Sequence, residues 1–193
     1  SSIEGSAQHQ PLTRLPSLQT VRQADTVEIT NDWHGYSDIT PILRHYKLRR
    51  ERQKFVGNAH IAVGGYGAAG IHQQQTTKIV IPAIIIAKFL ATLSKTPIQV
   101  GSYQPKIDRH DDYPSITIHL KSDLQQVTFS SQSQTLDRVP WQVTIEKDRK
   151  NAEYISNSAL PAQALQVLNR YLDIPGIDEI IQRRQQQKSA VLK

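Results

Sequence analysis

The chain contains no cysteine and no methionine among its 193 residues. Because a thiolate is the reactive form of cysteine and a common zinc ligand, its absence excludes disulfide bonds, thiol catalysis and cysteine-ligated zinc. The absence of methionine at position 1 indicates a processed or truncated chain. A polar leader before a domain is typical of exported proteins, so we expect an exported or periplasmic location rather than a cytoplasmic one.

Long hydrophobic runs are also missing. The most apolar stretch, residues 79–93, is interrupted by Pro82 and Lys88. A membrane-spanning helix needs about 20 consecutive apolar residues, so no transmembrane segment is expected. The sequence therefore indicates a soluble protein, and its length is sufficient to bury a hydrophobic core.

The formal net charge of +6 is unevenly distributed. Residues 182–193 carry +4, whereas residues 1–24 and residues 25–181 carry +1 each. The excess charge belongs mainly to the C-terminal end, which argues against nucleic-acid binding by the domain as a whole. We expect a flexible polar leader over 1–24, a single domain over 25–181 and a basic Gln/Arg/Lys tail over 182–193.

The clearest secondary-structure pattern lies between residues 111 and 145. Within 115–121, the apolar residues Ile116, Ile118 and Leu120 alternate with polar ones. This period of two is typical of a half-buried antiparallel strand. Three further short runs follow after polar links and predict a meander; they are residues 127–131, 141–145 and 154–156.

Other segments complete an α+β fold. An apolar stripe after Pro82 predicts one helix, residues 161–172 predict a second, and residues 177–184 a short third. Four more strands are expected at residues 26–30, 43–50, 55–63 and 77–81. We therefore predict a mainly antiparallel sheet of about six to eight strands, covered by two main helices, with flexible N- and C-terminal tails.

A glycine-rich segment follows one predicted strand. Gly65, Gly67 and Gly70 match the G-x-G-x-x-G pattern of dinucleotide-binding loops. That motif needs a helix directly after the loop and an acidic residue about twenty positions further on. Here a polar, strand-like segment follows, and isoleucines stand where the acid should be. A turn is the better interpretation.

A cluster of candidate metal ligands suggests an alternative function. Asp108, His110, Asp111 and Asp112 could hold a divalent ion in a metal-dependent hydrolase of the phosphodiester type. Adjacent residues on an extended chain point apart, however, and no established metal-binding spacing is present. We therefore predict no cofactor and favour a solvated loop, with a divalent metal as the alternative.

A second alternative is nucleic-acid binding. Arg49, Arg50, Arg52 and Lys54 surround a predicted hairpin tip, and cations of this kind contact phosphates. His45 and His60 are expected on the outward face of the same hairpin. An exposed charged face that keeps a sheet soluble is the simpler interpretation.

Aromatic residues beside turns are candidate contacts for a protein partner, since aromatic rings often anchor interfaces. The candidates, with one neighbouring histidine, are Trp33, His34, Tyr36, Tyr66, Tyr113 and Trp141. Each could instead fill the core.

No acid, base and nucleophile can be grouped from their spacing; the serines at 130, 131 and 133 lack the G-x-S-x-G context of a nucleophile elbow. The sequence therefore favours a non-enzymatic binding or interaction domain. We expect it to use an exposed sheet face, or the loops near Trp33 and residues 64–70, most readily for a protein partner. The oligomeric state does not follow from the sequence.

Overall fold

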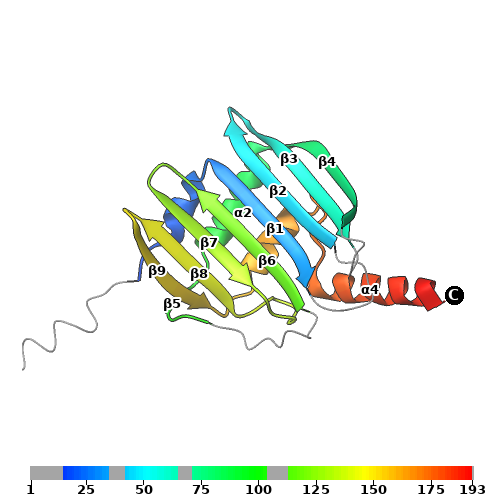
Figure 1. The fold of residues 1–193 in the computed structure, drawn as a ribbon. Helices are drawn as coiled ribbons and strands as arrows, with labels where there is room; N and C mark the ends of the chain where they lie inside the picture. Colours follow the sequence, from blue (N-terminus) through cyan, green and yellow to red (C-terminus); the bar gives the residue numbers. More distant parts are fainter. Residues whose placement is uncertain (1–14, 35–41, 65–70, 104–112, 193) are drawn as a thin grey trace, which may run out of the picture.

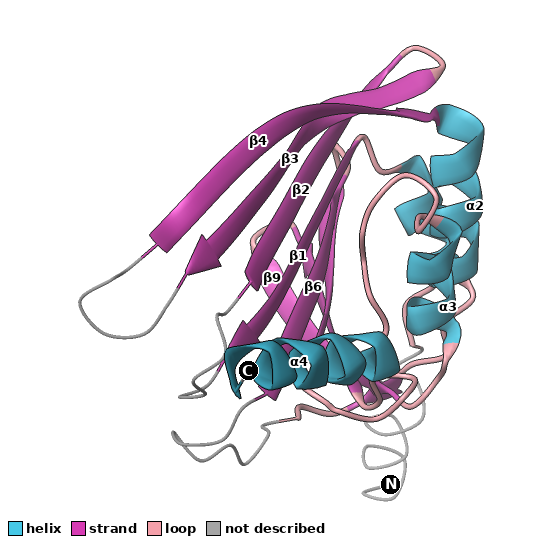
Figure 2. Ribbon diagram, turned by 90° about the vertical axis from the view of Figure 1, so that its right-hand side faces the viewer, coloured by secondary structure: helices cyan, strands magenta, loops and turns pink. Residues whose placement is uncertain are grey.

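The computed structural model describes residues 15–34, 42–64, 71–103 and 113–192. Nine antiparallel strands within these ranges form one sheet, in the order β4-β3-β2-β1-β6-β7-β8-β9-β5. Helices α2 and α3 pack on one side of this sheet, behind it in Figure 1 and to its right in Figure 2. We call that side the covered face and the opposite side the open face.

Along each strand the side chains alternate between the two faces. The strands are β1 Thr26–His34, β2 Ile42–Glu51, β3 Lys54–Gly64, β4 Ile71–Pro82, β5 Gln99–Val100, β6 Tyr113–Lys121, β7 Gln125–Ser131, β8 Trp141–Lys147 and β9 Lys150–Ser156. The helical elements are the 3-10 helix η1 Leu18–Gln23, α2 Ala83–Ser94, α3 Leu160–Val167 and α4 Ile177–Leu192.

The predicted antiparallel sheet with helices is confirmed, but its size is not. The described residues form nine strands rather than six to eight, and four helical elements rather than the two main helices and short third one that we expected. The strand that the pattern missed is β5, which spans two residues and pairs with β9. Two residues are too few to show a period-two alternation.

Strand β1 joins the two halves of the sheet. It pairs with β2 of the hairpin half (β2–β4) and with β6 of the meander half (β6–β9). Its inward residues Val27 and Ile29 are fully buried. Burial of apolar side chains at this central strand makes the two halves share one core.

Helix α2 supplies much of that core. The predicted apolar stripe is confirmed, because Ile86, Phe89, Leu90 and Leu93 are all completely buried. The helix begins at Ala83, one residue later than expected. Pro82 precedes it with an extended backbone (ψ 140°) and ends strand β4 instead.

Both ends of the described chain contain more structure than we expected. Leu18, Val21 and Ala24 are buried in the core, so residues 18–24 of the expected leader pack on the fold. At the other end, α4 continues to Leu192 through the expected tail. Helix α3, in contrast, ends at Val167, before the expected residue 172. None of the described helices combines the length and apolar character that crossing a membrane requires.

Strands β2, β3 and β4 curve toward α2 at one end of the sheet (Figure 2). Gly57 of β3 pairs with Leu48 of β2, and the two backbones approach closely there. A Cβ atom built on Gly57 would lie 1.7 Å from the carbonyl oxygen of Lys47 on β2. Only a residue without a side chain fits there.

Candidate functional site on the open face

The β2–β3 hairpin presents two histidines on the open face. The register places His45 of β2 directly opposite His60 of β3, so the expectation that they share the outward face is confirmed. On the covered face of the same hairpin, Tyr46 lies opposite Ala59 and both are buried. The alternation of side chains thus sends the polar residues of this hairpin outward.

Two rows of open-face residues cross the centre of the sheet. In one row, Glu28 of β1 lies between Lys47 of β2 and His119 of β6. In the next row, Thr26 lies between Arg49 and Lys121. Strands that lie far apart in sequence therefore bring several cations side by side.

The hairpin half of this face holds a shallow, open depression of about 460 Å³. Its charged lining consists of Lys47, Arg49 and Lys78 together with a single acid, Glu51. The remaining lining residues are neutral, namely Thr26, Leu48, Val56, Gly57 and Asn58. We call Lys47, Arg49 and Lys78 the basic patch.

The cations of the basic patch are not neutralised locally. Within the part of the chain that the structure describes, none of the three forms an ion pair. Glu28 lies beside Lys47, but its carboxylate Oε1 contacts Nε2 of His45 at 2.6 Å. The patch therefore keeps a positive potential that can attract an anion.

Cross-strand threonines hold the other two open-face histidines. Nδ1 of His60 lies 2.9 Å from Oγ1 of Thr76, and Nδ1 of His119 lies 2.8 Å from Oγ1 of Thr128. In each case the threonine is the residue directly opposite in the neighbouring strand. These contacts fix the imidazole rings against the sheet.

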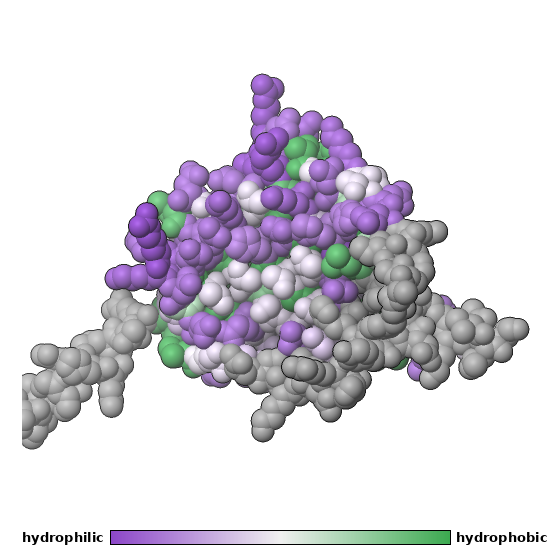
Figure 3. All heavy atoms as spheres, in the orientation of Figure 1, coloured by the Kyte–Doolittle hydropathy of each residue, from purple (hydrophilic) through white to green (hydrophobic). Residues whose placement is uncertain are grey.

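The meander half of the open face has a different character. Its central residues, Thr128, Ser130, Gln142 and Thr144, are neutral and half-buried. Figure 3 shows this contrast, with strongly hydrophilic residues over the hairpin half and paler residues across the middle of the sheet. The open face is thus basic on one side and nearly neutral in its centre.

The predicted hairpin-tip cations do not form one surface. Arg49 faces outward in the basic patch, whereas the guanidinium of Arg50 lies on the other side, 4.7 Å from the centroid of the Phe55 ring. Nε of Arg50 also lies 3.6 Å from Oδ1 of Asp25. Arg52 occupies the turn with a positive φ of 59°, and Lys54 begins β3. Neighbouring residues of a strand point to opposite faces, so a cluster in sequence is divided in space.

The predicted aromatic contacts are also separated. Trp141 is fully buried, and its Nε1–H donates to the carbonyl of Asp137 at 3.0 Å, so its ring belongs to the core. Tyr113 is half-buried at the start of β6. Trp33 and His34 are the last two residues of β1. Tyr36 and Tyr66 lie outside the described residues.

The candidate metal ligands Asp108, His110, Asp111 and Asp112 likewise lie outside the described residues. Among those that are described, no group of three or more His, Asp or Glu side chains could hold a metal ion.

The glycine pattern over 65–70 also lies outside the described residues, but the strands on either side of it are described. It connects the antiparallel partners β3 and β4, so a strand follows it instead of the helix that a dinucleotide loop requires.

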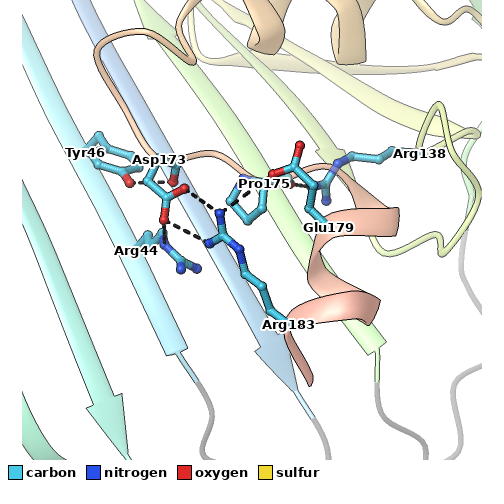
Figure 4. Close-up of polar contacts among 7 residues, drawn as sticks. All are labelled: Arg44, Tyr46, Arg138, Asp173, Pro175, Glu179 and Arg183. Carbon is cyan, nitrogen blue, oxygen red and sulfur yellow. Dashed lines mark hydrogen bonds and ion pairs between the residues drawn. The ribbon is translucent and has the colours of Figure 1, made fainter. Parts of the chain in front are cut away.

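A separate polar cluster fastens the C-terminal helix to the sheet (Figure 4). Asp173 accepts hydrogen bonds from Nε of Arg44 at 3.1 Å and from both terminal nitrogens of Arg183 at 3.1 Å each. Hydrogen bonds from Arg183, reinforced by Arg44, hold the pKa of Asp173 below its usual range. The hydroxyl of Tyr46 donates to the Asp173 carbonyl at 2.7 Å, and burial raises the pKa of Tyr46 to about 12.

Arg138 stabilises the segment just before α4. Its side chain is 3% exposed and donates to the carbonyl of Pro175 at 2.7 Å. Burial lowers the pKa of its guanidinium to about 10. Sequence reasoning found neither cluster, because Arg44 lies 129 positions from Asp173, and Arg138 lies 37 positions from Pro175. Their polar groups are engaged with one another, so we assign both clusters a structural role.

No family model matches the chain, and no curated protein and no solved structure matches it either.

Proposed function

We propose that the protein is a non-enzymatic binding domain that holds an acidic protein partner against its open sheet face. The basic patch carries this proposal. Lys47, Arg49 and Lys78 come from two different strands, converge on one depression and have no ion-pair partner among the described residues. Exposed cations that are not neutralised by their own chain raise the association rate and the specificity for a partner of opposite charge.

A protein partner fits this surface better than a nucleic acid. Proteins that bind single strands combine cations with aromatic side chains on which bases stack. Among the described open-face positions of β2, β3 and β4 there is no Phe, Tyr or Trp. The face can therefore attract a polyanion but offers bases no aromatic platform.

The proposal is tested by the binding of labelled polyglutamate, polylysine and oligothymidylate, each followed by fluorescence anisotropy. We expect polyglutamate to bind and polylysine not to bind. The affinity for polyglutamate should fall steeply between about 50 and 200 mM salt, because the attraction is between exposed charges. Failure of polyglutamate to bind contradicts the proposal. Tighter binding of oligothymidylate than of polyglutamate would favour nucleic-acid recognition instead.

A further inference from the structure

The two edges of the sheet are built differently. At one edge stands β5, which is only two residues long, whereas at the other stands β4 with twelve. Proteins usually protect a long edge with charges, prolines or bulges, because its free backbone groups can pair with another chain. Between Gln74 and Ile81, β4 carries a single charged residue, Lys78, and no proline.

The register shows which backbone groups of β4 face the free edge. Ala83 N–H donates to the carbonyl of Gln53 at 2.9 Å, just beyond the opposed pair Lys54 and Pro82. This bond marks Lys54 and Pro82 as a non-hydrogen-bonded pair, and such pairs alternate with hydrogen-bonded ones along an antiparallel ladder. The residues whose N–H and C=O groups point outward are therefore Gln74, Thr76, Lys78 and Val80.

The side chains around this edge define what could pair with it. All residues from 74 to 78 are exposed. Val80 is 47% exposed and Ile84, the second residue of α2, is 66% exposed, so two large apolar side chains lie near the end of the edge. On the open face, the register places Lys78 opposite Asn58, which in turn lies opposite Lys47. The edge thus adjoins the basic patch.

We propose that an extended segment of the acidic partner adds to β4 as a tenth strand. Its backbone pairs with the outward groups of Gln74, Thr76, Lys78 and Val80. Its acidic side chains lie on the open face, beside Lys78, and alternate with apolar side chains on the covered face, beside Ile79. Such strand addition takes its affinity from main-chain hydrogen bonds and its specificity from alternate side chains. This inference rests on the proposed function, because it names the form in which the acidic partner binds.

Charge favours this occupant over a second copy of the chain. A symmetric pairing of β4 with itself would continue the open face across both copies. It would bring two basic patches onto one surface, where like charges repel. An acidic strand complements the same charges.

A peptide of alternating glutamate and valine, of about ten residues, tests the proposal with two variants at one position. Thr76→Pro removes an outward N–H but no ladder bond to β3. Thr76→Val keeps that N–H and removes only the hydroxyl that contacts His60. We expect Thr76→Pro to weaken peptide binding about tenfold or more, the equivalent of at least one lost hydrogen bond. Thr76→Val should bind within about twofold of the wild type, since the strand contact is kept.

Peptide binding by folded Thr76→Pro at the wild-type affinity would overturn strand addition. If circular dichroism shows that this variant is unfolded, Gln74→Pro takes its place, because the Gln74 N–H also points outward. Sedimentation could instead show that the wild type is a dimer and that the proline variant is a monomer. This result would overturn the proposal that an acidic segment occupies the edge, and would favour a second copy of the chain. If polyglutamate binds the wild type, and the alternating peptide binds the wild type and the proline variant with equal affinity, strand addition fails while the proposed function stands. Absence of polyglutamate binding would remove the proposed function itself.

Discussion

Arg183 holds the carboxylate of Asp173 with both of its terminal nitrogens, at 3.1 Å each, and so fixes α4 to the segment that precedes it. The same carboxylate accepts a hydrogen bond from Arg44 on β2. Beyond the buried residues Ile177 and Ile180, the exposed residues of α4 whose side chains the structure describes are mainly polar. The attachment of this helix to the sheet therefore depends on Asp173 as well as on these two isoleucines.

Replacement of Asp173 by asparagine should reduce the free energy of unfolding at neutral pH. The ion pairs are partly exposed, so we expect a loss of about 0.5–1 kcal/mol. Because the folded-state pKa of Asp173 is lowered, its contribution is present above the pKa of the unfolded chain and is lost as pH falls. The difference between wild type and variant should thus shrink below about pH 4. Urea unfolding of both proteins at pH 7 and below about pH 4 measures this difference in stability. Asp123→Asn, in an exposed turn, is the control. A stability difference that does not change with pH would contradict the role of the Asp173 carboxylate.

Tyr46→Phe should remove the hydrogen bond to the Asp173 carbonyl and cost about 1 kcal/mol at pH 8. The pKa of Tyr46 is raised to about 12 by burial. Its neutral form is therefore favoured in the folded state, and the associated stability is present below about pH 10 and is lost as pH rises toward 12. Denaturant unfolding of both proteins should show the wild type losing more stability than the variant over this range. Parallel losses would indicate that another group titrates.

Gly57→Ala should destabilise the curved hairpin. The new methyl group would overlap the carbonyl oxygen of Lys47, a backbone atom that cannot move without distorting β2. We expect a loss of about 3 kcal/mol, as in other overpacked sites, seen as a lower melting temperature. Gly176→Ala is the matched control, because a Cβ at that position meets no atom within 4 Å. Equal melting temperatures for the two variants would refute the close approach at Gly57.

Arg138 offers a comparison between charge and volume. Arg138→Ala creates a cavity and deprives the Pro175 carbonyl of its hydrogen-bond donor. We expect it to lower the free energy of unfolding by about 2–3 kcal/mol. Arg138→Met fills most of the space and removes a buried charge whose desolvation is unfavourable, so it should lie much closer to the wild type. Thermal unfolding ranks the three proteins. A methionine variant as unstable as the alanine variant would show that the guanidinium itself is required.

The sequence pattern was informative wherever one face of an element is buried and the other is not. The hairpin β2–β3, the meander and the stripe of α2 all have this property. Strand β4 was only half predicted, from residue 77, because residues 74–78 are exposed on both faces and show no alternation. The 3-10 helix η1 was missed because six residues with two buried apolar side chains, Leu18 and Val21, are too few to establish a period.

The candidate site was predictable only where it is local. His45, His60 and Arg49 lie on one hairpin, and their orientation follows from the strand period. The contact of His45 with Glu28 and the arrival of Lys78 beside the patch depend on the pairing of β2 with β1 and of β3 with β4. Pairing between strands is set by the whole core and leaves no mark on the sequence near these residues.

The most direct measurement of the central claim is the affinity for polyglutamate of two variants with equal net charge. One reverses the basic patch (Lys47→Glu, Arg49→Glu, Lys78→Glu). The other reverses three exposed cations elsewhere, Lys88 and Lys95 around α2 and Lys150 at the start of β9 (Lys88→Glu, Lys95→Glu, Lys150→Glu). At about 0.1 M salt, we expect the first variant to lose affinity by about tenfold or more, while the second stays within about threefold of the wild type, because charges more than about 10 Å from the ligand are screened. Equal losses in the two variants would show that overall charge, rather than the open face, holds the ligand.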